Sequence, residues 1–194
     1  MTLKILVPCK RLREGKSRLA SVLSGDERHA LCREFLKTTL ALASSVTASA
    51  DCLLVSSDAE AVALAEAQNI ASLGDDGKGL NPALQLGRDR LCGEEGSSLL
   101  ILPIDLPRAD TATLRNLVAA PADVVIAPDR ARQGTNVLYL RSKAVGLDFR
   151  YGAGSFEAHR QLALDAGWSV EVFENPALSF DIDQPEDLAG WRRG

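Results

Sequence analysis

Residues 98–107 read SLLILPIDLP, and this stretch decides the fold class. The run Ser98–Leu102 is apolar on both faces of an extended chain, which is typical of a central strand covered by helices on both sides. Asp105 follows where this strand ends. The stretch therefore predicts a buried strand that carries a carboxylate just beyond its carboxyl end.

Short apolar runs and helical patterns alternate on both sides of this stretch. The expected strands are 3–7, 51–56, 70–73, 98–102, 123–127, 136–141 and 169–173, and the expected helices are 26–44, 58–68, 80–91, 110–119, 155–166 and 186–191. This alternation predicts an α/β fold with three layers and a mostly parallel sheet, with one antiparallel strand near 136–141. We expect the 194 residues to form a single domain.

Composition limits the classes of partner. The chain is 46% hydrophobic and 25% charged, which excludes disorder for the chain as a whole. It has 22 basic and 26 acidic residues, so its formal net charge is −4. An acidic chain with 5% aromatic residues disfavours both a nucleic acid and an anionic membrane as partner.

The cysteine pattern and the N-terminal sequence indicate the cellular compartment in which the protein is expected. Cys9, Cys32, Cys52 and Cys92 are widely spread and form no C-x-x-C pair, which argues against a zinc site and a disulfide framework. We expect each to be a small core residue. The apolar start of the chain is too short for a signal peptide, and no run reaches the roughly 18 residues of a membrane span. A cytoplasmic location is the expectation.

The segment from Pro8 to Arg18 follows the first expected strand, and five of its eleven residues are basic. Gly15-Lys16-Ser17 ends like a phosphate-binding P-loop, but the motif's first glycine would fall at Lys10, so that match fails. A cationic loop over the carboxyl edge of a sheet still suits a triphosphate. A solvated basic loop is the equal alternative.

A second glycine-rich segment, 152–155, precedes an expected helix. It resembles a dinucleotide fingerprint, but the last glycine would fall at Glu157, and the segment does not follow the first strand. What is left is a helix N-terminus at which backbone N–H groups and the Ser155 hydroxyl could hold an anion. Taken alone, the pattern favours an ordinary capped turn.

Three aspartates are expected at the same edge of the sheet. If residues 181–183 are extended, Asp181 and Asp183 point to the same side, about 7 Å apart. Together with Asp105 they would repel one another unless a cation lay among them. Mg²⁺ prefers one or two carboxylates plus phosphate oxygens and water. The alternative for Asp181 and Asp183 is turn and capping chemistry before Pro185.

The two histidines lie in expected helices, and no metal-ligand spacing surrounds them. His29 is expected on a helix surface. His159 lies four residues after Ser155 and is expected either on a helix surface or behind the site. The sequence contains no Gly-x-Ser-x-Gly elbow, so a serine hydrolase has no support.

Taken in order, several short segments resemble the CofC/FbiD family, the guanylyltransferases of coenzyme F-420 biosynthesis, which belong to the MobA-like, GT-A-type nucleotidyltransferases. These segments are Pro8 with 15–19, then 79–81, 103–107, 134–136, 151–156 with His159, and 181–188. The resemblance spans residues 4–188 and implies a three-layer, Rossmann-like GT-A fold with a mixed sheet.

The resemblance also implies an activity. Members of the family move GMP from GTP onto the phosphate of a three-carbon phospho-acid and release pyrophosphate, with one or two Mg²⁺ ions. Acceptors across the family are 2-phospho-L-lactate, phosphoenolpyruvate and 3-phosphoglycerate. The product passes to a downstream transferase of the F-420 pathway, which implies a functional hand-off.

Site residues follow from the resemblance, position by position. Mg²⁺ would be held by Asp105, Asp181 and Asp183. The acceptor would be held by Thr135, Gly152 and Ser155. The nucleotide would be held by Pro8, Lys10, Gly15, Lys16, Ser17 and Arg18, with Gly79, Leu80 and Asn81 near the nucleoside. Lys16, Arg18 and Asp105 would carry catalysis.

Rival readings stay open. The nearest is another MobA-like nucleotidyltransferase with a different nucleotide or acceptor. From another class comes a non-catalytic nucleotide-binding module that regulates a partner. A Rossmann oxidoreductase is the third. A homodimer through the helix that starts at Ser155 is a further expectation.

Overall fold

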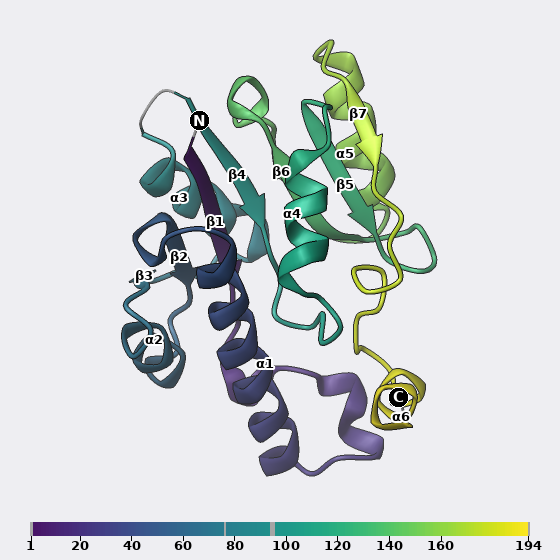
Figure 1. Ribbon diagram of the computed structural model, residues 1–194. Coiled ribbons are helices and arrows are strands. Elements are labelled where there is room, and N and C mark those ends of the chain that lie inside the picture. Colours follow the sequence, from purple (N-terminus) through teal and green to yellow (C-terminus); the bar gives the residue numbers. More distant parts are fainter. Residues whose placement is uncertain (1, 76, 94–95, 194) are drawn as a thin grey trace.

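A computed structural model describes residues 2–75, 77–93 and 96–193 of the chain. Over these residues, seven strands form one sheet in the order β3-β2-β1-β4-β6-β5-β7 (Figure 1). The strands are β1 (Thr2–Pro8), β2 (Cys52–Val55), β3 (Ala71–Leu73), β4 (Ser97–Ile101), β5 (Val124–Pro128), β6 (Thr135–Leu140) and β7 (Val170–Val172). β4, which contains most of the apolar run 98–102, lies at the centre of the sheet and is buried throughout.

Most neighbouring strands run parallel, and β6 is the exception. It pairs antiparallel with β4 on one side and with β5 on the other, which confirms the strand predicted to run antiparallel. Because β6 runs backwards, its first residue, Thr135, lies at the same edge of the sheet as the carboxyl ends of the parallel strands. This reversal brings an additional segment to the ligand-binding edge.

Six α-helices are found in the described residues, and all six were expected. They are α1 (Gly25–Val46), α2 (Ala59–Glu66), α3 (Leu80–Leu91), α4 (Thr111–Ala119), α5 (Ser155–Asp165) and α6 (Pro185–Arg193). Helix α1 begins with a capping box between Ser24 and Glu27. The side chain of Asp58 caps α2 and that of Asp110 caps α4, which explains why these helices begin where they do.

The helices cover both faces of the sheet, which confirms the three layers. Ile5 packs with buried residues of α1, α2 and α4 on one face. Its neighbour Leu6 points the other way and packs with residues of α3 and α5. A smaller third cluster joins α6 to α1 and to the segment after β1 (Figure 1). The packing in this cluster holds the C-terminal segment against the segment that follows β1, at the carboxyl edge of the sheet.

The structure also bears on the cysteines and on membrane-spanning helices. Cys9, Cys32 and Cys52 are buried, as expected of small core residues, and Cys92 is half-buried. Within the described ranges, no helix combines the length and the apolar character that crossing a membrane requires.

Candidate active site

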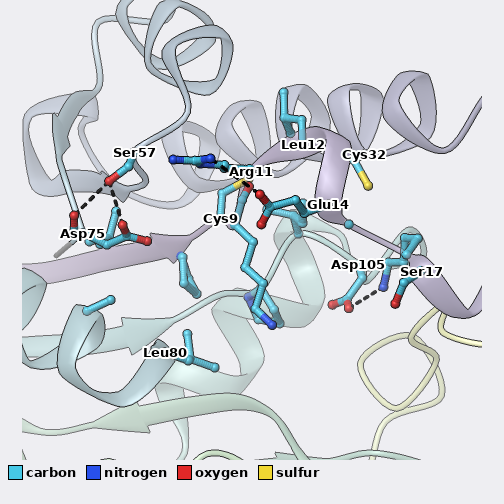
Figure 2. A pocket seen from close by; sticks show the side chains of 18 of the residues that line it. Cys9, Arg11, Leu12, Glu14, Ser17, Cys32, Ser57, Asp75, Leu80 and Asp105 are labelled. Carbon is cyan, nitrogen blue, oxygen red and sulfur yellow. Dashed lines mark hydrogen bonds and ion pairs between the residues drawn. The ribbon is translucent and has the colours of Figure 1, made fainter. Parts of the chain in front are cut away.

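Two adjoining cavities open at the carboxyl edge of the sheet. The larger has a volume of about 860 Å³ and lies beneath the segment that follows β1 (Figure 2). The smaller has a volume of about 270 Å³ and is lined by the start of β6 and the turn before α5. The carboxylates of Asp105 and Asp183 line both cavities. The site is therefore divided into two compartments that meet at a pair of acidic side chains.

The segment after β1 is shaped by contacts rather than left free. It contains two short 3-10 helices, η1 (Leu12–Glu14) and η2 (Ser17–Ser21). The backbone N–H of Leu12 donates to the carboxylate of Asp58 over 2.9 Å, so the cap of α2 also anchors this segment. Gly15 lies so close to α1 that a Cβ atom there would stand 2.5 Å from the Cys32 sulfur. Only glycine fits at this position without a shift of its neighbours.

Lys16 turns back from this segment into the site. Its backbone is left-handed, with φ at 53°, a conformation that few residues other than glycine adopt. Its side chain is 8% exposed, and its Nζ lies 2.7 Å from Asp105 Oδ2 and 2.8 Å from Asp183 Oδ1. Burial alone would lower the pKa of Lys16, but the two carboxylates outweigh it and hold that pKa above its ordinary value. The lysine is therefore a fixed cation between the two acids.

The third aspartate is in a different electrostatic state. Burial raises the pKa of Asp181 above its ordinary value, and the negative charges of Asp105 and Asp183 raise it further. Arg18 donates to Asp183 over 3.2 Å from the solvent side. At the start of α6 it is the Asp187 carboxylate that accepts the backbone N–H groups of Asp183 and Gln184. The capping role considered for Asp181 and Asp183 is thus carried out by Asp187. Three carboxylates thus lie near one another, and only two have a lysine partner.

The smaller cavity is built from β6 and the start of α5. Thr135, Gly152 and Ser155 all line it. The backbone N–H of Thr135 donates to the Ser155 hydroxyl oxygen over 2.9 Å, which joins strand to helix. Gly154 caps α5 with φ at 73°, a conformation that suits glycine. The backbone N–H groups of Ser155 and Phe156 donate to the carbonyls of Gly152 and Gln133, so these two donors hold the turn rather than stand free for an anion.

Two side chains hold this cavity from behind. His159 is fully buried, so its expected alternative on a helix surface is wrong; it contacts the Thr135 hydroxyl over 2.9 Å. Asn81 holds the backbone of Tyr151 at both ends, accepting from its N–H over 2.8 Å and donating to its carbonyl over 3.0 Å. The oxygen and the nitrogen of the Asn81 side-chain amide are therefore both engaged with Tyr151.

The structure brings together most of the residues that the sequence analysis singled out. The larger cavity is lined by Pro8, Lys10, Gly15, Lys16, Ser17, Arg18, Gly79, Leu80, Asp105 and Asp183. The smaller is lined by Asp105, Thr135, Gly152, Ser155, Asp181 and Asp183. Asn81 lines neither of these two cavities. A contact between its side chain and a nucleoside stays a prediction.

Sequence reasoning missed how the site is supported. Leu12 and Asp58 are 46 residues apart in the chain, and Asn81 and Tyr151 are 70 apart, so neither pairing leaves a local signal. His159 did leave one, because a position four residues after Ser155 lies on the same face of a helix. His29 bonds to Glu60 over 2.7 Å, between α1 and α2 and away from the two cavities.

The donor set suits a hard divalent cation only in part. No group of three or more His, Cys, Asp or Glu side chains is placed to hold a metal ion within the described part of the chain. Lys16 lies between the two carboxylates that could contribute. Since Mg²⁺ typically uses one or two protein carboxylates together with substrate phosphates, Asp105 and Asp183 fit as the protein's share of such a site.

Known proteins similar in sequence span nearly the whole chain. A family model described as "Guanylyl transferase CofC like" matches residues 3–191. The phosphoenolpyruvate guanylyltransferase of Rubrobacter xylanophilus is 41% identical, over 97% of this chain and 93% of that protein. The 2-phospho-L-lactate guanylyltransferase of Methanothermobacter thermautotrophicus is 36% identical, over 94% of this chain and 81% of that protein.

Solved structures share the fold at much lower identity. A Desulfovibrio desulfuricans protein described as a nucleotide-diphospho-sugar transferase superposes with a TM-score of 0.82 at 17% identity, over 100% of this chain and 87% of that one. A nucleotidyl transferase from Methanothermobacter superposes with a TM-score of 0.71 at 16% identity, over 99% and 96%. These likenesses confirm the nucleotidyltransferase type of α/β fold.

Proposed function

The chain belongs to the family of CofC-like guanylyl transferases, and from this premise we propose that it transfers GMP from GTP to the phosphate of a three-carbon phospho-acid. Pyrophosphate is the second product. The larger cavity takes the nucleotide, and the smaller takes the acceptor.

The observation that carries this proposal is the junction of the two cavities. A basic segment lines the larger one, and Asp105 and Asp183 form part of the wall common to both. A triphosphate in one compartment and a phosphate in the other would meet at this wall. The arrangement supports a reaction between two bound anions, for which charge neutralisation and alignment are the main needs.

The reaction balances without a protein base. An oxygen of the acceptor phosphate forms a bond to the α-phosphorus of GTP, while the bond from that phosphorus to the bridging oxygen of the leaving pyrophosphate breaks. The attacking oxygen is already anionic at neutral pH, so no proton has to be removed. This agrees with the burial and hydrogen bonding of His159, which leave it engaged in support of the cavity.

Two cations of the basic segment have separate tasks in this proposal. Lys16 is buried, so its charge acts at close range and with little screening by solvent. Arg18 is mostly exposed, and its guanidinium can follow the departing pyrophosphate. We assign Lys16 to the triphosphate near the point of attack, and Arg18 to its outer phosphates.

Mg²⁺ belongs to the proposal as the cofactor of the transfer. Asp105 and Asp183 would hold it together with phosphate oxygens, and Asp181 would lie beside them. The raised pKa of Asp181 supports this, because a carboxylate crowded by two others gains from a nearby cation. When bound, the ion would neutralise charge that develops on the α-phosphate and on pyrophosphate.

We propose phosphoenolpyruvate as the acceptor, because the relative that is 41% identical carries that name. The acceptor 2-phospho-L-lactate is the second choice, on the name of the relative that is 36% identical. By the same reasoning, the product would be a labile diphosphate handed to a downstream transferase in coenzyme F-420 biosynthesis.

The test is acceptor-dependent pyrophosphate release. The purified protein is incubated with GTP and Mg²⁺, and phosphoenolpyruvate, 2-phospho-L-lactate or 3-phosphoglycerate is added in separate reactions. The deazaflavin Fo and a downstream transferase are added to trap the labile product, which is identified by mass. CTP, UTP and ATP replace GTP in a parallel series.

Release of pyrophosphate with GTP and one phospho-acid would support the proposal and identify the acceptor. Release with another nucleotide would favour a related nucleotidyltransferase instead. Binding of GTP without turnover in every reaction would refute the proposal and favour a non-catalytic nucleotide-binding module.

A further inference from the structure

His159 is a histidine whose two ring nitrogens both have partners. The side chain is fully buried on α5 and faces the start of β6. Its Nε2 accepts a hydrogen bond from the backbone N–H of Arg150 over 2.9 Å. Its Nδ1 lies 2.9 Å from the hydroxyl oxygen of Thr135. The edge of its ring also contacts Tyr151, with 4.9 Å between ring centroids.

These two partners determine which nitrogen carries the proton. A backbone N–H can only donate, so Nε2 must be the unprotonated nitrogen. A neutral imidazole then carries its hydrogen on Nδ1, and Nδ1 donates to Thr135 Oγ1. Protonation of Nε2 as well would place two N–H donors face to face, that of the ring and that of the Arg150 backbone. Burial and the nearby Arg150 charge also lower the pKa of His159 to about 4, so the neutral ring prevails at neutral pH.

The donation by His159 fixes what the Thr135 hydroxyl can do. One lone pair of Oγ1 receives the Nδ1 hydrogen, which turns the hydroxyl's own hydrogen away from the ring. Within the described residues, Thr135 Oγ1 has no other hydrogen-bond partner, and Thr135 lines the smaller cavity. The hydroxyl hydrogen is therefore available to a group bound in that cavity.

The Ser155 hydroxyl is also left as a hydrogen-bond donor, because it too accepts a hydrogen bond from the protein. Its Oγ accepts the backbone N–H of Thr135, which leaves its own hydrogen for another partner. Ser155 also lines the smaller cavity. Two neighbouring hydroxyls thus each receive a hydrogen bond from the protein and each keep a hydrogen to donate. Such a pair favours a ligand oxygen that only accepts, such as that of a phosphate or a carboxylate.

We propose that His159 is a positioning residue that holds the Thr135 hydroxyl as a hydrogen-bond donor to an anionic oxygen of the acceptor. The proposal rests on the proposed function, because that function assigns the acceptor to the smaller cavity. His159 acts through Thr135 and does not itself touch the acceptor.

The tautomer can be read directly in the unaltered protein. The chain has two histidines, so ¹⁵N-labelled histidine gives two sets of ring signals, and a His29→Gln variant assigns them. We expect Nδ1 of His159 to show the signal of a protonated nitrogen at pH 7, and Nε2 that of an unprotonated one. The opposite assignment would overturn the proposal, whether or not the protein is active.

Kinetics test the action through Thr135. In His159→Gln, the side-chain oxygen can replace Nε2 as the acceptor for Arg150, but no donor faces Thr135. In His159→Asn, the amide can replace Nδ1 as the donor to Thr135. We expect the KM for phosphoenolpyruvate to rise roughly tenfold to a hundredfold in His159→Gln, the range of one hydrogen bond to a charged group. His159→Asn should recover most of this loss, while kcat and the KM for GTP change little in both.

A double-mutant cycle separates positioning from mere structural support. Thr135→Val removes the hydroxyl and keeps the shape of the side chain. In that background His159→Gln should cause no further rise in the KM for the acceptor, because its effect passes through the missing hydroxyl. Additive effects, or equal rises in the KM for GTP, would overturn the proposal. Melting temperatures of all variants identify any that fail to fold, and the tautomer measurement needs no substitution at His159 or Thr135.

Failure of the proposed function would look different. If the wild-type protein releases no pyrophosphate with any acceptor, the proposed function is refuted. The nitrogen signals then still decide whether His159 donates to Thr135.

Discussion

Replacing Lys16 with methionine tests the electrostatic centre of the site. The side chain keeps most of its length and its apolar stem but loses its ammonium group, and the two carboxylates that it joins lose their shared partner. Breaking a fully buried ion pair costs about 3–5 kcal/mol, whereas exposed pairs contribute about 0–1 kcal/mol. Lys16 is 8% exposed, but Asp105 is 26% and Asp183 is 41% exposed, so solvent screens part of the loss. We therefore expect the free energy of unfolding to fall by about 1–3 kcal/mol.

The same variant should weaken nucleotide binding. A lysine that donates to a phosphate is typically worth about 1.5–3 kcal/mol, which corresponds to a loss of affinity of roughly tenfold to a hundredfold. Urea unfolding followed by tryptophan fluorescence measures the first effect, and calorimetry with a non-hydrolysable GTP analogue measures the second. Methionine is preferred to glycine, since glycine would also relieve the left-handed backbone at this position.

The matched control is Lys37→Met. Lys37 is an exposed residue of α1, so the variant loses the same charge outside the two cavities. If Lys16→Met and Lys37→Met had the same stability and the same affinity for the GTP analogue, the central position argued for Lys16 would be wrong.

Four other predictions concern single side chains. Asp105→Asn should reduce turnover by roughly two orders of magnitude or more, as is typical for positioned electrostatic groups, and near-normal kcat in the folded variant would remove Asp105 from catalysis. Asn81→Leu should raise the KM for the acceptor more than the KM for GTP, because Asn81 holds Tyr151 beside the smaller cavity; a change in the KM for GTP alone would favour the nucleoside contact predicted from the sequence. Tyr151→Phe should leave stability unchanged or raise it by about 1 kcal/mol, since the Tyr151 hydroxyl is buried with no partner among the described residues; a clear loss in urea unfolding would disprove this. Burial and Arg150 lower the pKa of His159 from 6.5 to about 4, so between these pH values the unfolded chain binds a proton that the folded chain does not. The stability that His159 contributes above pH 6.5 should therefore be lost as the pH falls to about 4, by about 3 kcal/mol at most. Urea unfolding of His159→Gln should show a flatter dependence of stability on pH over that range.

The fold could be predicted because its determinants are local. The apolar run of β4 marks a strand covered on both faces, and the caps at Asp58 and Asp110 mark helix starts within a few residues. Strand ends then indicate where ligands bind, since parallel strands share one functional edge. This reasoning located Asp105 without any resemblance to a known family.

Thr135 shows where that rule fails. It lies at the start of its strand, so a search of strand ends does not find it; it reaches the functional edge because β6 runs antiparallel. Only the resemblance to a family pointed to it. Asn81 shows a different failure, because residue type alone does not reveal whether an amide faces a ligand or a distant backbone segment.

The position of Lys16 gives a physical reason for the gathering of so many charges at one edge. Asp105 and Asp183 would destabilise each other if both stood alone in a half-buried wall, and Lys16 relieves this by pairing with both. In the proposed function, a triphosphate would compete with these carboxylates for the same ammonium group. Release of Lys16 to the nucleotide would take that partner from Asp105 and leave Asp183 with the exposed Arg18, which would raise the affinity of the two acids for a cation that arrives with the phosphates. Lys16 and Asp183 are 167 residues apart, so this exchange of partners follows from the fold and not from any local motif.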